Sequence, residues 1–166
     1  MCKRNRNDIK IILIGSGRLK SSLIERANRE ALNNIFFHEP VNKDELAGLF
    51  SSADLGLQVL ANFEAFYYGT SPNKFFDYIA AGLPVLINYP GLIANLVSSN
   101  DAGFVVAPEN ANAFANALEI AADNRSDLKA KGINAKRLGI KDFDRKSQSS
   151  QWVDVLESVE ISMEKK

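Results

Sequence analysis

The chain has 166 residues, of which 46% are hydrophobic and 24% charged, and its formal net charge at pH 7 is zero. This length suits one domain with one core, so residues 1–166 are expected to form a single domain, and the balanced charge argues against a nucleic-acid-binding protein. Cys2 is the only cysteine and His38 the only histidine, which excludes an internal disulfide and a thiolate metal cluster, and we expect no metal.

The first part of the chain predicts a strand, a glycine turn and a helix. A polar lead-in over residues 1–8 precedes residues 9–14, which are apolar except for Lys10 and are typical of a buried parallel strand. Gly15-Ser16-Gly17 follows, and residues 18–32 show helical spacing of their apolar side chains. Such a turn lets the backbone approach a ligand, although a plain tight turn that needs positive φ is the alternative. A dinucleotide fingerprint would need glycine in place of Lys20, so an NAD site is disfavoured.

The next segments continue the alternation. Residues 35–37 and 53–60 are predicted strands, and residues 43–52 form a predicted helix with Asn42 as its N-cap. Residues 61–70 are irregular and crowded with aromatic side chains. These rings could flank a ligand or cover the core, and the sequence favours neither interpretation.

Residues 69–87 carry the most informative pattern, GTSPNKFFDYIAAGLPVLI. Ser71 can cap the first turn of a helix, and Pro72 suits the first helical position. Gly82 with the following proline ends this helix before a buried apolar strand.

The start of this predicted helix is suited to binding an anion. Asn73 and Lys74 lie in its first turn, where unpaired backbone N–H groups and the helix dipole favour a phosphate group. Asp77 follows Lys74 by three residues, so a cation and a hydroxyl acceptor lie on one helix face.

The rest of the chain predicts one more strand and several helices. A helix is expected to end at Leu138, before Gly139, and a C-terminal helix to cover residues 145–164. Strands alternating with helices predict an α/β protein with a Rossmann-like open parallel sheet and helices on both faces. The remaining predicted elements are the strands at 85–87 and 104–106 and the helices near 91–97 and 110–122.

The pattern SPNKFFDYIAAGLPVL resembles the donor-site helix of GT-B glycosyltransferases of family four, also called glycosyl transferases group 1. The resemblance identifies the chain with the C-terminal, donor-binding half of that fold, and it implies that the first strand and helix of this half are missing. It also implies that Asp77 binds the ribose hydroxyls.

Many relatives carry glutamate where this chain has Gly69, so no catalytic residue is assigned. The residues expected around the rest of the donor are Gly15, Gly17, Arg18, Ser71, Asn73 and Lys74 at the diphosphate, and His38, Glu39 and Val41 beside the nucleobase.

The resemblance implies a retaining glycosyltransferase whose donor is a nucleotide-diphosphate sugar and which needs no cofactor. The acceptor, a glycan or a lipid-linked molecule, would be bound by an N-terminal domain that this chain lacks, so the chain alone is expected to be inactive. Two alternatives stay open: a non-catalytic module that binds a nucleotide sugar or a partner, and a GT-B nucleotide-sugar epimerase. The longest apolar run, residues 11–14, is too short to cross a membrane. We expect a cytoplasmic protein, with membrane association at the inner face only through a parent protein.

Overall fold

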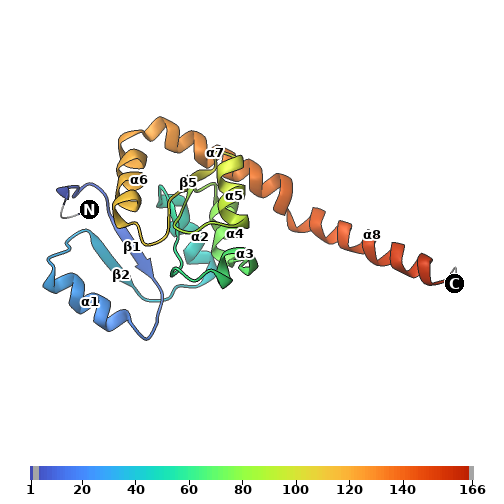
Figure 1. Cartoon of the computed structure of the whole chain (residues 1–166), viewed down its shortest axis with the longest axis horizontal. Coiled ribbons are helices and arrows are strands. Elements are labelled where there is room, and N and C mark those ends of the chain that lie inside the picture. The colour runs from blue at the N-terminus through green and yellow to red at the C-terminus, as the bar shows by residue number, and fades with distance from the viewer. Residues whose placement is uncertain (2–3, 165–166) are drawn as a thin grey trace.

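The computed structural model describes residues 1 and 4–164, with side chains described through residue 158, and shows strands alternating with helices (Figure 1). The alternation confirms the predicted α/β class. In chain order the elements are β1 (Ile11–Ile14), α1 (Lys20–Arg29), β2 (Ile35–His38), α2 (Lys43–Ser52), β3 (Gly56–Gln58), α3 (Ala65–Gly69), α4 (Asn73–Ala81), β4 (Val85–Ile87), α5 (Leu92–Ser99), β5 (Gly103–Val105), α6 (Ala111–Asp123), α7 (Arg125–Phe143) and α8 (Arg145–Glu164).

The strands are parallel and form two hydrogen-bonded groups, β1–β2 and β3–β4–β5. In the described part of the chain no strand pairing joins β1 to β3. Nevertheless, Ile11 of β1 and Leu57 of β3 pack against the same apolar cluster around Leu86. Side-chain packing therefore joins the two groups where backbone pairing does not.

Helices cover both faces of the three-stranded group, as predicted. Val85 and Ile87 of β4 face a core formed with α4, α5 and α7, whereas Leu86 points to the other face and contacts α6. All three side chains are fully buried. This alternation follows from the period of two along a strand, and it explains why β4 is an uninterrupted apolar run.

Helix α7 packs along α4 and is longer than the sequence predicts. The prediction that this helix ends before Gly139 is wrong, because α7 continues through Gly139 to Phe143. A Cβ atom on Gly132 would lie 2.7 Å from the carbonyl oxygen of Gly82, and one on Gly139 would lie 3.4 Å from the backbone of Ile79. The glycines in α7 thus allow close helix packing and do not end the helix.

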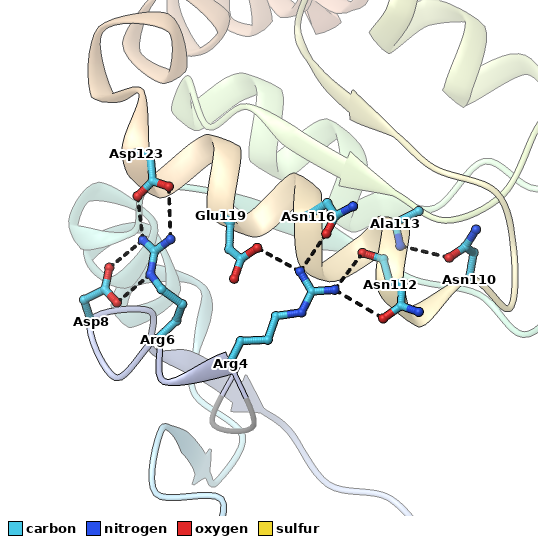
Figure 2. Close-up of polar contacts among 9 residues, drawn as sticks. All are labelled: Arg4, Arg6, Asp8, Asn110, Asn112, Ala113, Asn116, Glu119 and Asp123. Carbon is cyan, nitrogen blue, oxygen red and sulfur yellow. Dashed lines mark hydrogen bonds and ion pairs between the residues drawn. The ribbon is translucent and has the colours of Figure 1, made fainter.

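Two arginines of the N-terminal lead-in, residues 4–8, form hydrogen bonds and ion pairs with α6 (Figure 2). Arg4 donates to the side chains of Asn116 and Glu119, at 2.6 and 2.8 Å. Arg6 binds the carboxylates of Asp8 and Asp123, each at 2.8 Å. Residues 2 and 3 of the predicted lead-in lie outside the described residues. Five residues of irregular backbone, 4–8, therefore lie along α6 and lead into β1.

Helix α8 extends away from the rest of the molecule (Figure 1), and Trp152 and Leu156 on it are 66% and 63% exposed. Among the described residues, no helix has both the length and the apolar composition needed to cross a membrane.

Candidate nucleotide-sugar site

The start of α4 differs in detail from the sequence prediction. Pro72 is the N-cap residue and Asn73 the first helical residue, so the expected place of Pro72 inside the helix is wrong. The expected capping role of Ser71 is also wrong, since no side chain caps α4. Ser71 lies one position before the N-cap, whereas a capping side chain belongs to the N-cap residue itself.

Without a side-chain cap, the first turn of α4 keeps backbone donors for another partner. The Phe75 N–H donates to the Pro72 carbonyl at 3.0 Å, while Asn73 and Lys74 are exposed. By contrast, α2, α6 and α7 are each capped by an asparagine side chain. The open first turn of α4 suits an anion, because its free N–H groups and the positive end of the helix dipole point outward.

Core packing fixes which face of α4 is exposed. Phe75 and Ile79 are buried at 0% and 1% exposure, whereas Lys74 and Asp77 are exposed. The Tyr78 ring of α4 packs directly on Gly56 of β3. A Cβ atom on Gly56 would lie only 2.6 Å from this ring, so the glycine allows the close contact between helix and strand. Lys74 and Asp77 therefore share the solvent face, as the spacing predicts.

The turn after β1 has open space beside both of its glycines. Gly15 has a φ of 139°, which favours glycine, whereas Gly17 has no positive φ. No atom lies within 4 Å of the Cβ position at either glycine. Arg18 is exposed, and no hydrogen bond or ion pair ties its side chain to another described residue.

Lys20 joins this turn to the loop after β2. Its ammonium group donates to the carbonyl oxygens of Gly15 and His38, at 3.0 and 2.8 Å, and to the Glu39 carboxylate at 2.8 Å. This role of Lys20 is not predicted from the sequence, where Lys20 serves only as evidence against an NAD site. The sequence signal that could have indicated this role is the position of Lys20, which stands where a dinucleotide fingerprint has its third glycine. With its ammonium group engaged in this way, Lys20 holds the two loops in place.

The predicted site residues thus fall into two groups. Gly15, His38 and Glu39 are brought together by Lys20, and Val41 is half-buried at the end of the same loop. The second group is the start of α4. In the part of the chain that the structure describes, no hydrogen bond or ion pair joins the two groups. The loops of the first group leave the carboxyl ends of parallel strands, the edge where α/β sheets bind ligands.

The aromatic segment before α4 has two parts. Tyr67 is buried and stacks on Tyr89 with ring centroids 6.2 Å apart. Phe63 and Phe66 are 58% and 53% exposed and contact each other. Tyr68 is 74% exposed. The structure therefore assigns Tyr67 to the core and leaves the other three rings on the surface that leads to α4.

A family model described as Glycosyl transferases group 1 matches residues 1–124, a span that contains both groups of site residues. The chain belongs to this family. The glycosyl transferase match ends close to the end of α6, so it includes β1 to β5, the strands of the described part of the chain. No curated protein matches the chain.

Solved glycosyltransferase structures share the fold of this group 1 chain. Anabaena HepE in complex with UDP-glucose is 19% identical, with a TM-score of 0.75 over 90% of this chain and 41% of HepE. Sucrose-phosphate synthase from Thermosynechococcus elongatus is also 19% identical, with a TM-score of 0.76 over 92% of this chain and 39% of the synthase. The pneumococcal O-GlcNAc transferase GtfA in complex with UDP and GlcNAc is 16% identical, with a TM-score of 0.70 over 94% of this chain and 30% of GtfA.

These matches confirm the predicted fold, the C-terminal half of GT-B glycosyltransferases. The chain spans less than half the length of each of these three proteins.

Proposed function

We propose that this chain is the donor-binding domain of a retaining glycosyltransferase that transfers a sugar from a nucleoside diphosphate to a glycan or a lipid-linked acceptor. The observation that carries the proposal is the uncapped first turn of α4, in which Asn73 and Lys74 are exposed, with Asp77 exposed on the same face of the helix. Membership of the glycosyl transferases group 1 family supports it. The complexes of HepE with UDP-glucose and of GtfA with UDP make a uridine nucleotide the first donor to test.

In this proposal the start of α4 binds the diphosphate. The N–H groups of the first turn and the ammonium group of Lys74 stabilise the negative charge that develops on the leaving group. Ser71 and Asn73 add polar side chains. The turn of Gly15 and Gly17 approaches the same diphosphate from the end of β1. Because the Lys20 ammonium group is engaged by the two loops, Arg18 is the side chain of that turn which can add a second cation.

The nucleoside is placed between the two groups of site residues. Asp77 accepts hydrogen bonds from the ribose hydroxyls, three residues beyond Lys74 on the same helix face. The loop of His38, Glu39 and Val41 borders the nucleobase, and the contacts of Lys20 with this loop hold it in place.

Transfer itself requires a second domain for the acceptor, so we expect this chain alone to be inactive. The exposed apolar side chains of α8, Trp152 among them, offer a surface for that domain. We place the protein in the cytoplasm. The alternative of a non-catalytic nucleotide-sugar module is favoured by Gly69, because it ends α3 where many relatives carry glutamate, and it has no side chain to contact a sugar.

Calorimetric titration of the chain with UDP, GDP and their sugar conjugates tests the proposal. We expect one nucleotide to bind selectively and Lys74→Ala to weaken its binding by about 1–3 kcal/mol, the contribution of a charge-assisted hydrogen bond. Lys10→Ala is the matched control, because Lys10 is exposed and lies before β1. Affinity that Lys74→Ala leaves unchanged would overturn the assigned phosphate site. Assay of sugar transfer by the chain joined to an acceptor domain distinguishes an enzyme from a module.

A further inference from the structure

The solvent face of α7 is strongly basic and also apolar. Among its exposed residues there are five cations, two isoleucines and two small residues, and no carboxylate. The two acids of α7, Asp127 and Asp142, are half-buried at the borders of this face. The exposed residues, called here the α7 outer face, are Arg125, Ser126, Lys129, Ala130, Ile133, Lys136, Arg137, Ile140 and Lys141.

Packing against α4 holds this face outward. Leu128, Ala135 and Leu138 are buried on the opposite side of the helix, at 5%, 0% and 2% exposure. Ile133 and Ile140 are seven residues apart, so they lie two turns apart on the same side. They are 55% and 64% exposed. The orientation of the α7 outer face is therefore a consequence of the core and does not depend on a partner.

The two isoleucines lie in a shallow groove bordered by cations. Its volume is about 460 Å³, and its lining residues are Ile133, Lys136, Arg137, Ile140 and Lys141. The apolar side chains thus share one stretch of the surface with basic side chains of the same helix.

The positive charge of this face is only partly compensated. Arg125 pairs with Asp54, and Lys141 lies 3.9 Å from Asp142. Asp127 is directed to the buried Lys131 at 3.5 Å.

The other cations of the face meet no carboxylate. Lys136 donates to the Ala80 carbonyl and Arg137 to the Asn134 side chain, which are neutral groups. Lys129 has no ion pair among the described residues. A chain of zero net charge therefore concentrates positive charge here.

We propose that the α7 outer face docks this domain on a membrane surface that contains anionic lipids. An exposed apolar pair with lysine and arginine side chains around it suits contact between a folded domain and a membrane surface that carries negative charge. The cations contact the lipid phosphates, and Ile133 and Ile140 enter the boundary between headgroups and acyl chains. A second copy of the chain is disfavoured as the occupant, because two such faces would oppose like charges. The face contains no residue of α4 and none of the residues assigned to the donor.

Flotation of the full chain with vesicles tests this proposal. Vesicles of phosphatidylcholine alone are compared with vesicles of phosphatidylcholine and phosphatidylglycerol, at low and high salt. We expect binding only to the anionic vesicles and weaker binding at high salt, since salt screens exposed charges. The double variant Lys129→Glu/Arg137→Glu should lower binding by about 25-fold or more, because each cation near an anionic surface contributes about 1 kcal/mol, or about fivefold.

Matched variants separate the α7 outer face from general charge effects. Lys10→Glu/Lys43→Glu changes the net charge equally at exposed positions outside α7 and should retain binding. Ile133→Ser/Ile140→Ser should weaken the binding that remains at high salt, with an unchanged circular dichroism melt. Equal losses in both charge variants, or no preference for anionic vesicles, would overturn the proposal. A dimer in light scattering that Ile133→Ser/Ile140→Ser abolishes would assign the face to a second copy instead. None of these readouts involves a nucleotide.

Discussion

Asp77 provides the sharpest test of the nucleoside assignment. Its side chain is exposed on the same face of α4 as Lys74, and it lies beyond the first turn that would hold the phosphates. We predict that Asp77→Asn weakens binding of UDP by about 1.5–3 kcal/mol, the range for hydrogen bonds to a charged group, and leaves inorganic pyrophosphate nearly unaffected. Calorimetry with both ligands measures the difference. A loss that is equal for the two would remove the ribose assignment.

Gln58 is a second residue with a measurable consequence, because its amide is buried at the carboxyl end of β3. Both its amide nitrogen and its oxygen, like the Tyr89 hydroxyl, have no hydrogen-bond partner of normal geometry within the described residues. We predict that Gln58→Met/Tyr89→Phe raises the free energy of unfolding by about 1–2 kcal/mol, since it removes the unsatisfied buried polar groups on both sides and keeps most of the volume. Urea unfolding measures this change in the free energy of unfolding, and Gln151→Met, at an exposed position of α8, is the control. Destabilisation would instead indicate a bound water at Gln58.

The candidate site shows what residue patterns can and cannot predict. The exposure of Lys74 and Asp77 on one face follows from helical spacing, so it could be predicted. The position of Ser71 could not be fixed, because the helix starts one residue later than its pattern suggests, and boundaries depend on backbone angles that several residues allow. The role of Lys20 is non-local. It joins two loops that only the pairing of β1 with β2 brings together.

At the scale of elements, the contact of α7 with α4 depends on Gly132. A Cβ atom there would lie 2.7 Å from the Gly82 carbonyl oxygen, which belongs to rigid backbone. We predict that Gly132→Ala lowers the free energy of unfolding by about 1–2 kcal/mol, because the cost of overpacking exceeds the gain in helix propensity. Thermal or urea unfolding measures this change.

Gly48 supplies the matched control for Gly132. It lies inside α2, is exposed, and has no atom within 4 Å of its Cβ position. Gly48→Ala should therefore stabilise the protein by about 0.5–1 kcal/mol. If Gly132→Ala and Gly48→Ala were both stabilising, α7 would not pack against the backbone of Gly82 as closely as described here.

The elements themselves were predicted where pattern and caps agree. Asn42 caps α2 in a capping box, and Gly82 ends α4 in the left-handed conformation with a φ of 77°. The end of α7 was mispredicted because Gly139 was interpreted as a helix end, whereas its small size serves packing against Ile79. Helix α3 was not predicted, since its five residues are too few to show a periodic pattern.

At the scale of the whole molecule, the sequence predicts the parallel strands but not their division. Strand identity depends on local apolar runs, whereas the break between β1 and β3 depends on which strand edges meet, and that information is not local. The hydrophobic cluster shared by Ile11, Leu57 and Leu86 holds the two groups together without backbone pairing. We therefore expect the β1–β2 unit to rely on side-chain packing and on its connection to α6.

That connection gives a prediction about acid stability. The Arg6 guanidinium beside Asp8 lowers the pKa of that carboxyl below its ordinary value, chiefly through their hydrogen bonds. A carboxyl with a lowered pKa in the folded state contributes stability above its unfolded pKa, about 3.9, and this contribution is lost as the pH falls through the folded value. Asp8→Asn should therefore melt at a lower temperature than the wild type at pH 6.

As the pH falls below the folded pKa of Asp8, the two proteins should converge, because the wild-type carboxyl is then protonated as well. Thermal melts across this pH range measure the gap, and Asp154→Asn on α8 is the control for a general charge effect. Hydrogen exchange of the amides in residues 4–10 should speed up in Asp8→Asn at pH 6, because the lead-in loses one of the contacts that orient Arg6 toward Asp123 on α6. A gap that stays constant from pH 6 to pH 3 would show that Asp8 acts through packing and not through its charge.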